Sequence, residues 1–185
     1  MKVHFIAIGG SVMHQLAIAL KNKGYEVSGS DDEIFEPARS NLLKAGLLPT
    51  VTGWFYDKIT PSLDAVILGM HAREDNPELQ KARLLKIPIY SFPEYIFEES
   101  KNKTRIVIGG SHGKTTITAM VMHVLRECGM QFDYVVRAHI EGFEYTVKIS
   151  DASVIVREGD EYPASVLEKT PKFHFFAPHI AVITS

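Results

Sequence analysis

The sequence lacks the features that would place it in a specialised class of proteins. It has one cysteine, Cys128, so no disulfide can form within the chain, which excludes a disulfide-stabilised scaffold and favours a reducing compartment. We expect that cysteine to be a small buried residue rather than a reactive thiol. The formal net charge is −2, from 20 basic and 22 acidic residues, so we expect no nucleic-acid partner. No apolar run approaches the roughly 18 residues of a membrane helix, and we expect a cytoplasmic protein without membrane insertion.

What is present is the composition of an ordinary folded protein, with 45% hydrophobic and 23% charged residues over 185 positions. Short apolar segments rich in β-branched residues alternate with segments of helical periodicity. The predicted strands cover residues 3–8, 25–30, 65–68, 87–90, 104–108, 154–157 and 180–183, and the predicted helices begin at residues 12, 77, 92 and 114. This alternation predicts an α/β fold with parallel, doubly wound sheets, because parallel strands need helical crossovers.

The chain divides into two units of similar plan. In each unit a strand is followed by a glycine turn and then by a helix. A polar stretch at residues 98–103 lies between them. We predict a Rossmann-like N-terminal domain over residues 1–100 and a second, truncated domain over residues 104–185. The chain stops directly after a predicted strand, with too little sequence after residue 104 to close a nucleotide-binding sheet, so we expect a fragment.

The strongest motif lies between the strand at 104–108 and the helix that begins at Lys114. Backbone N–H groups of a glycine-rich turn at a helix N-terminus bind phosphate, a lysine reaches the β- and γ-phosphates, and a hydroxyl binds Mg²⁺. The turn departs from G-x-x-x-x-G-K-[ST] by one position, because residue 108 is isoleucine. We predict that it binds phosphate rather than being a purely structural turn, through Gly110, Ser111, His112, Gly113, Lys114, Thr115 and Thr116.

An acidic segment, Glu158-Gly159-Asp160-Glu161, follows the apolar strand at 154–157. Carboxylates at the carboxyl end of such a strand lie near the phosphate crevice, where Mg²⁺ needs hard oxygen ligands. A solvated acidic turn is the alternative interpretation. The phosphate motif upstream favours a metal site, and we predict Glu158 and Thr115 as its ligands.

A weaker glycine turn, Gly9-Gly10-Ser11-Val12-Met13, follows the first predicted strand and departs from G-x-G-x-x-G. Asp31 follows about 20 residues later at the end of the second strand, where a dinucleotide fold places the acid that binds ribose. We therefore favour nucleotide binding over a plain structural turn. His71 follows the strand at 65–68 and is expected at the same edge of the sheet. A helix cap with solvated charges is an equally good interpretation of that segment.

Five motifs taken together resemble the Mur ligases of peptidoglycan synthesis, in their order, in their approximate spacing and over the whole chain. They are Gly-Gly-Ser-Val-Met at 9–13, Val-Ser-Gly-Ser-Asp at 27–31, Arg-Glu-Asp-Asn-Pro-Glu-Leu at 73–79, Gly-Ser-His-Gly-Lys-Thr-Thr at 110–116 and Glu-Gly-Asp-Glu-Tyr at 158–162. Two positions depart from the family pattern, since Ser111 replaces a threonine and Arg137 replaces a glycine.

The resemblance implies an N-terminal domain that holds the uridine diphosphate of UDP-N-acetylmuramic acid, and a P-loop ATPase domain that begins near residue 104. A further domain for the incoming amine would follow residue 185, so we expect that this chain alone does not complete ligation. The implied chemistry uses ATP and Mg²⁺ to convert the substrate carboxylate into an acyl phosphate, which an amine opens to an amide. Lys114 would be the catalytic residue that stabilises charge on the transferring phosphoryl group.

The family leaves two acceptors open, which are free L-alanine and the tripeptide L-alanyl-γ-D-glutamyl-meso-diaminopimelate. The alanine-adding enzymes typically have a glycine where this chain has Val12, so we favour the tripeptide. An NAD(P)-dependent oxidoreductase that uses residues 9–31 is another alternative, but it leaves Lys114 without a role. A non-catalytic module that binds a UDP-sugar is the third alternative. Histidines outside these motifs have no metal-ligand spacing, and we interpret them as structural.

Overall fold

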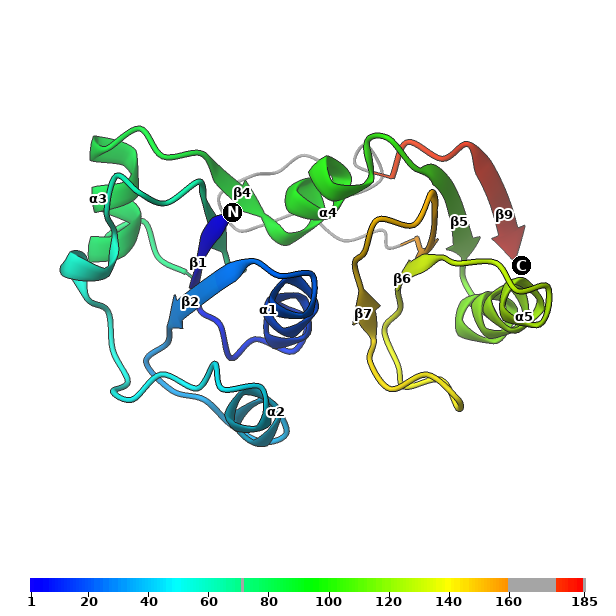
Figure 1. Ribbon diagram of the computed structural model, residues 1–185, viewed down its shortest axis with the longest axis horizontal. Coiled ribbons are helices and arrows are strands. Elements are labelled where there is room, and N and C mark those ends of the chain that lie inside the picture. Colours follow the sequence, from blue (N-terminus) through cyan, green and yellow to red (C-terminus); the bar gives the residue numbers. More distant parts are fainter. Residues whose placement is uncertain (71, 160–175, 185) are drawn as a thin grey trace. The chain divides into compact units, whose positions relative to one another are not determined.

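The computed structural model describes residues 1–70, 72–159 and 176–184, and these form two compact units (Figure 1). The chain passes from the first unit to the second between Tyr95 and Ile96. Each unit is built on a mainly parallel sheet with helices packed against it, which confirms the predicted α/β fold class.

The first unit holds a four-stranded sheet in the order β2-β1-β3-β4, with all neighbours parallel. Its elements are β1 (Lys2–Ile6), α1 (Met13–Asn22), β2 (Glu26–Ser30), α2 (Ala38–Lys44), the short 3-10 helix η1 (Tyr56–Lys58), β3 (Ala65–Leu68), α3 (Pro77–Leu84) and β4 (Ile89–Ser91). Phe5 and Ile6 of β1, and Leu16 and Leu20 of α1, are completely buried, because the apolar positions of both elements face one core.

The strand order has its switch point between the carboxyl ends of β1 and β3. The crossover through α1 runs from β1 outward to β2, whereas the crossover through α3 runs from β3 outward to β4. Right-handed crossovers in opposite directions put the two helices on opposite faces of the sheet, as Figure 1 shows for α1 and α3. The strand order reverses between β1 and β3, which is where ligands bind in open sheets of this kind.

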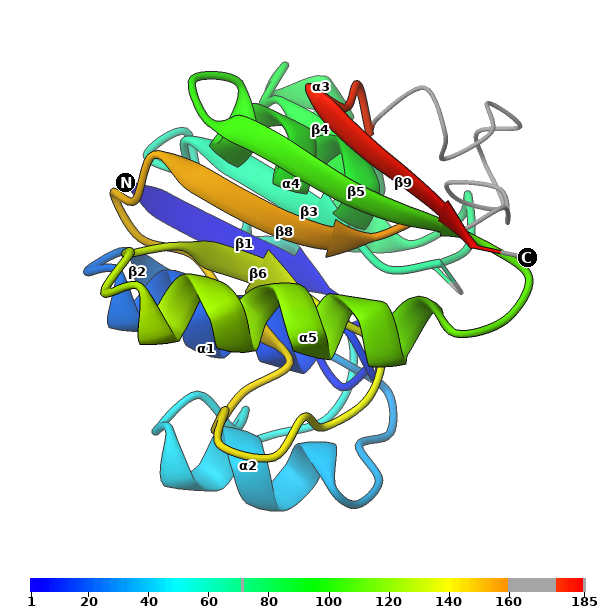
Figure 2. The same cartoon turned by 90° about the vertical axis from the view of Figure 1, so that its right-hand side faces the viewer.

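The second unit holds a five-stranded sheet in the order β7-β6-β8-β5-β9, in which only the β6–β7 pair is antiparallel. Its elements are β5 (Thr104–Gly110), α5 (Lys114–Glu127), β6 (Asp133–Val135), β7 (Val147–Lys148), β8 (Val154–Glu158) and β9 (Ile180–Thr184), and the helix α4 (Phe92–Ser100) precedes them across the division between the units. Figure 2 shows α5 along one face of the sheet. Ile108, Met122, Tyr134 and Val156 form part of the core beneath it.

A buried ion pair holds the amino-terminal edge of this second sheet. The Lys103 ammonium donates to the Asp133 carboxylate at 2.5 Å and to the backbone carbonyls of Ser150 and Ala152 at 2.6 and 3.0 Å. Its side chain is 9% exposed and that of Asp133 is completely buried. The charge is therefore compensated by an ion pair and two carbonyl dipoles, which is what burial of an ammonium group requires.

Three details differ from the sequence-based expectations. The first strand ends at Ile6 because Ala7 has a positive φ of 65° and turns the chain. The elements α2, η1, β6 and β7 were not expected; β6 and β7 have only three and two residues, and strands this short carry no periodic signal. The prediction that Cys128 is buried was wrong: it is exposed, because it lies about 240° around α5 from the buried Met122. Within the described part of the chain, no helix is both long and apolar enough to span a membrane.

Candidate functional site

The turn after β1 and the acid after β2 meet at one point. The Gly9 N–H donates a hydrogen bond of 2.7 Å to the Asp31 Oδ2. The two segments lie side by side because the N–H groups of Ala7 and Ile8 donate to the Ser30 carbonyl at 2.9 and 3.1 Å. A Cβ on Gly9 would lie 2.9 Å from the same carboxylate oxygen, so the close approach requires glycine.

Asp31 is a buried acid with an altered proton affinity. It is 6% exposed. Burial raises the pKa of Asp31 to about 6, the neighbouring Asp32 acts in the same direction, and the hydrogen bond from the Gly9 N–H opposes both. Its carboxylate is suited to accept hydrogen bonds from hydroxyl groups of a ligand, because it already lies at the carboxyl end of β2.

The start of α1 leaves backbone donors available. Val12 is the N-cap residue and makes no side-chain cap. For the N–H groups of Ser11 and Val12 the described residues provide no hydrogen-bond acceptor, and both residues are exposed. Met13, by contrast, is 3% exposed and packs into the core, so only its backbone can take part in binding. Free N–H groups at a helix N-terminus favour an anion.

The end of β3 approaches this turn closely. The Gly69 N–H donates to the Ile6 carbonyl at 2.9 Å, and a Cβ on Gly69 would lie 2.7 Å from that of Ala7. His71, which was predicted at this edge, lies outside the described residues. Downstream, the Asn76 side chain accepts from the N–H groups of Glu78 and Leu79 at 2.9 and 3.1 Å and caps α3, as the sequence predicted.

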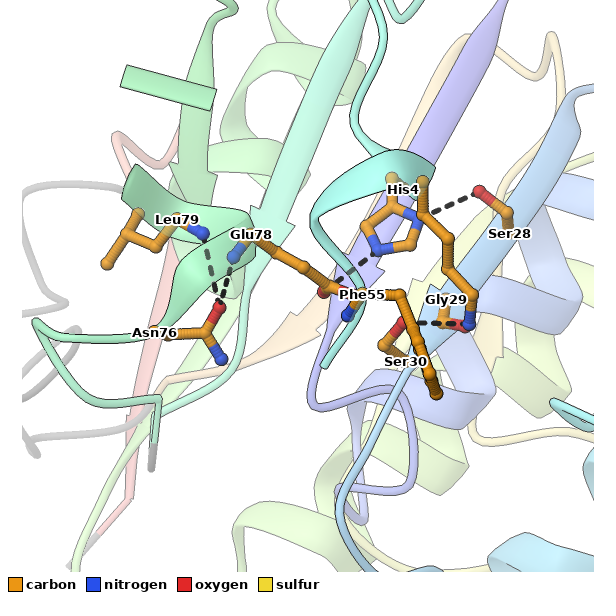
Figure 3. A network of polar contacts seen from close by, with 9 residues as sticks. His4, Ser28, Gly29, Ser30, Phe55, Asn76, Glu78 and Leu79 are labelled. Atoms are coloured by element: carbon orange, nitrogen blue, oxygen red, sulfur yellow. Dashed lines mark hydrogen bonds and ion pairs between the residues drawn. The ribbon is translucent and has the colours of Figure 1, made fainter. Parts of the chain in front are cut away.

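A buried polar network that sequence reasoning missed connects β1, α3 and the segment before η1 (Figure 3). The Glu78 side chain is completely buried; its Oε2 lies 3.1 Å from His4 Nε2, and its Oε1 accepts from the Phe55 N–H at 2.8 Å. The other nitrogen of His4 lies 2.8 Å from the Ser28 hydroxyl oxygen. Burial alone would raise the pKa of Glu78, but hydrogen bonds from His4, the Phe55 N–H and Ser30 outweigh it and hold the pKa below its usual value.

This network holds residues 53–58 beside Asp31. The Gly53 N–H donates to the Asp31 carbonyl at 2.6 Å. At the other end of the segment, the Lys58 ammonium donates to the Ser30 hydroxyl at 2.9 Å and to the Gly29 carbonyl at 3.2 Å. No sequence spacing could have indicated this arrangement, since His4 and Glu78 are 74 positions apart.

The second glycine turn, between β5 and α5, has different polar groups from the first turn, between β1 and α1. The Lys114 ammonium donates to the Gly110 carbonyl at 2.6 Å and to the Ser111 carbonyl at 3.2 Å, so it lies over the loop. Gly113 has a φ of 74° at the N-cap of α5. A Cβ on Gly110 would overlap the Thr184 carbonyl oxygen of β9, so this position admits only glycine. His112 and Ser111 are exposed, as a phosphate cradle requires.

Glu158 is the last residue of β8 and pairs in register with Ile108, just before the loop. It is 6% exposed, and neither of its carboxylate oxygens has a hydrogen-bond partner among the described residues. The Gly159 N–H donates to the Ile108 carbonyl at 2.7 Å and keeps the acid at the strand end. A buried carboxylate without a donor is costly unless a cation compensates it, so the chemistry of this site fits Mg²⁺. Asp160 and Glu161 lie outside the described residues.

A cavity of about 510 Å³ adjoins the second turn along α5. The residues that line it are Thr115, Thr116, Ala119, Met120, His123, His139, Ile140, Glu141 and Phe143. Arg126 holds its far wall, because the guanidinium donates to the Gly142 carbonyl at 3.2 Å and lies 4.9 Å from the Phe143 ring centre. Sequence reasoning did not predict that these residues lie beside the second turn, because the segment has no regular secondary structure.

The geometry agrees with comparisons to known proteins. A family model described as "Mur ligase family, catalytic domain" matches residues 2–104, so the chain belongs to the Mur ligase family. Over 183 residues it is 34% identical to the UDP-N-acetylmuramate–L-alanine ligase of Carboxydothermus hydrogenoformans, which covers 99% of this chain and 38% of that protein. Over 186 residues it is 27% identical to the UDP-N-acetylmuramate–L-alanyl-γ-D-glutamyl-meso-2,6-diaminoheptandioate ligase of Escherichia coli K12, which covers 100% of this chain and 40% of that protein.

A comparison with solved structures also finds Mur ligases. The UDP-N-acetylmuramate:L-alanyl-γ-D-glutamyl-meso-diaminopimelate ligase from Neisseria meningitides superposes with a TM-score of 0.84 at 26% identity, over 98% of this chain and 59% of that one. The chain spans about two fifths of the length of the curated relatives it matches.

Proposed function

We propose that the chain forms the UDP-sugar and ATP sites of an ATP-dependent ligase that joins UDP-N-acetylmuramic acid to an amine. The observation that carries this proposal is the second glycine turn, where Lys114 lies over the loop and the buried Glu158 carboxylate has no donor among the described residues. A cationic side chain and an uncompensated acid beside the same loop are what a magnesium nucleotide needs.

In this proposal the loop residues Gly110 to Thr116 bind the ATP phosphates through their N–H groups. Thr115 and Glu158 hold Mg²⁺, which supplies electrostatic stabilisation of the phosphate charge. Lys114 leaves the Gly110 carbonyl and contacts the transferring phosphoryl group, where its charge acts more strongly in the transition state than in the ground state.

The cavity along α5 takes the acyl end of the sugar substrate, since it begins at Thr115, beside the phosphate loop. A carboxylate oxygen of the substrate attacks the γ-phosphorus as the bond to ADP breaks, which gives an acyl phosphate. The amine nitrogen then attacks the acyl carbon, phosphate leaves, and the nitrogen loses a proton to form the amide. Thr116 and His139 line this cavity and would bind the carboxylate before attack.

The first unit holds the uridine diphosphate in this proposal. The N–H groups of Gly10 to Met13 contact the diphosphate at the start of α1, Asp31 accepts from a ribose hydroxyl, and His71 completes the same edge. Asp31 has the required position because Gly9 fixes it against the turn. An NAD(P)-dependent oxidoreductase would use this unit alone and would leave the second turn without a function.

For the acceptor, we propose the tripeptide L-alanyl-γ-D-glutamyl-meso-diaminopimelate rather than L-alanine. Val12 in the first turn supports this choice, as do the names of the Escherichia coli relative and of the Neisseria structure. The alternative is L-alanine, which the higher identity to the Carboxydothermus ligase favours. The first turn does not contact the amine, so it reports only the branch of the family.

A competition assay tests this proposal. A protein of the relatives' length that contains this chain is incubated with UDP-N-acetylmuramic acid, Mg-ATP and both amines, and the products are identified by mass. The expected product is the tripeptide adduct, with ADP and phosphate formed in equal amounts. A larger kcat/KM for L-alanine would reverse the choice of acceptor, and binding of NAD without any ADP formation would overturn the ligase itself.

A further inference from the structure

His14, in the first turn of α1, contacts the glycine turn from behind. It is 4% exposed, and its Nδ1 lies 2.8 Å from the Gly10 carbonyl oxygen. The same oxygen accepts from the His14 backbone N–H at 3.1 Å. A carbonyl oxygen can only accept, so Nδ1 must carry the proton. The opposite nitrogen, Nε2, then accepts from the side-chain amides of Gln15 at 3.0 Å and Asn41 at 3.4 Å.

This ring is held as one neutral tautomer. Burial lowers the pKa of His14, and the hydrogen bond to Gly10 only partly opposes that effect. A second proton on Nε2 would face the amide donors of Gln15 and Asn41. The neutral ring with its proton on Nδ1 therefore satisfies every contact that the structure gives it.

The orientation of one peptide group follows from this contact. In a trans peptide the C=O and the N–H point in opposite directions, and the Gly10 carbonyl shares its peptide group with the Ser11 N–H. When His14 holds the carbonyl on the helix side, the Ser11 N–H must point away from it. Ser11 is exposed, and its N–H has no acceptor in the described part of the chain.

The turn also lacks the usual device for holding a helix start. A serine, threonine or aspartate N-cap would hold the helix start by accepting from N–H groups two or three residues further along, whereas Val12 makes no side-chain cap. The His14 ring stabilises the turn by donating to the Gly10 carbonyl. It leaves the N–H groups of Ser11 and Val12 without an acceptor among the described residues. The start of α1 is therefore stabilised while its backbone N–H groups stay accessible to an anion.

We propose that His14 is a positioning residue, whose Nδ1–H holds the Gly10 carbonyl so that the Ser11 N–H faces the diphosphate of the UDP-sugar. This rests on the proposed function, because it takes UDP as the ligand of the first turn. The role concerns the phosphates alone, since the His14 ring is buried behind the turn. Removal of this hydrogen bond therefore weakens binding of UDP and leaves binding of uridine unchanged.

The test is calorimetric titration of the 185-residue chain with UDP and with uridine. His14→Leu keeps bulk without a donor, and His14→Gln places its amide toward Nε2, away from Gly10. Both are expected to weaken UDP binding about three- to tenfold, the scale of one neutral hydrogen bond. His14→Asn places an amide near the Nδ1 position and should restore binding to within about twofold of the wild type. The control Asn41→Ala removes only the long contact to Nε2 and should change neither ligand.

Long-range proton–nitrogen NMR of the unmodified chain provides a second measurement that does not depend on a variant folding. The expected result is a proton on Nδ1 of His14, and a proton on Nε2 would overturn the inference. Equal loss of UDP and uridine in His14→Leu would show a merely structural role and also overturn it. If the wild type binds UDP and His14→Leu binds it equally well, only this inference fails. If the wild type does not bind UDP, the proposed function of the first turn fails with it.

Discussion

The two glycine turns each join a strand to a helix, but they carry opposite polar groups. Each follows a strand with parallel neighbours on both sides, and each leads into a helix. In the first turn an acid, Asp31, accepts from the Gly9 N–H, and no lysine is present within the turn. In the second turn a cation, Lys114, donates to the loop carbonyls, and the acid Glu158 stands on the neighbouring strand.

In the proposed function, this difference lets one strand–turn–helix plan serve two kinds of nucleotide chemistry. An acid against the turn occupies one N–H group and offers an acceptor for ribose, so the first turn is suited to hold a nucleotide without reacting. A lysine on the loop and an acid without a donor suit a phosphoryl group that must move with its metal.

Lys114→Ala is expected to have the largest effect. In a complete ligase that contains this chain, turnover should fall by ~10²–10³, the scale for removing one preorganised electrostatic group. Binding of UDP-N-acetylmuramic acid to the first unit should not change. Rates of ADP release and equilibrium binding of the UDP-sugar give the two readouts, with the exposed Lys101→Ala as the control. Wild-type turnover in Lys114→Ala would make the second turn purely structural.

Substitution of Gly110 and of Gly9 by alanine should lower the free energy of unfolding by very different amounts. Gly110→Ala introduces a Cβ that overlaps the Thr184 backbone at a φ of 123°, and we expect a loss of at least about 3 kcal/mol. Gly9→Ala meets the Asp31 carboxylate, a side chain that can shift, so about 1 kcal/mol is expected. Urea unfolding of both variants provides the comparison. Equal losses would contradict the proposed difference in how tightly the turns are packed.

Asp31 should make the stability of the first unit depend on pH. Its pKa is raised from 3.8 to about 6 in the folded chain. A raised pKa means that the stabilising contribution is complete below pH 3.8 and is lost as the pH rises through about 6, by at most about 3 kcal/mol. In Asp31→Asn this loss should be absent, so the variant gains on the wild type between pH 4 and 7. Parallel curves of unfolding free energy against pH for the two proteins would refute the assignment.

Glu158→Gln is expected to separate stability from binding. Because the carboxylate is buried without a donor among the described residues, its neutral analogue should raise the unfolding free energy by about 1 kcal/mol without ligands. The extra stability that Mg-ATP provides should fall at the same time. Thermal unfolding with and without Mg-ATP measures both, with the exposed Glu127→Gln as the control. Undiminished stabilisation by Mg-ATP in Glu158→Gln would exclude Glu158 as a ligand.

The sequence predicted the parts of the fold that carry a periodic or a turn signal. The strand at 65–68, the Asn76 cap and the helix start at Lys114 lie where they were expected. The contact of Asp31 with Gly9 agrees with the pairing of those two residues in one predicted site.

The network of His4 and Glu78 could not be predicted, since a hydrogen bond between residues 74 positions apart depends on strand order and helix placement. The cavity wall at residues 139–143 was missed for a related reason. It is irregular backbone fixed by Arg126, and neither periodicity nor turn chemistry identifies it.

The hydrogen bonds from Lys114 to its own loop hold the loop in one conformation. The two hydrogen bonds from the ammonium draw the Gly110 and Ser111 carbonyls together and keep the loop in shape. A side chain on the surface changes rotamer within nanoseconds, so the exchange of carbonyls for phosphate oxygens does not delay binding. In the proposed function, the loop is kept in order by the same group that leaves it for the phosphate, so the entropy of ordering is lost before the nucleotide binds.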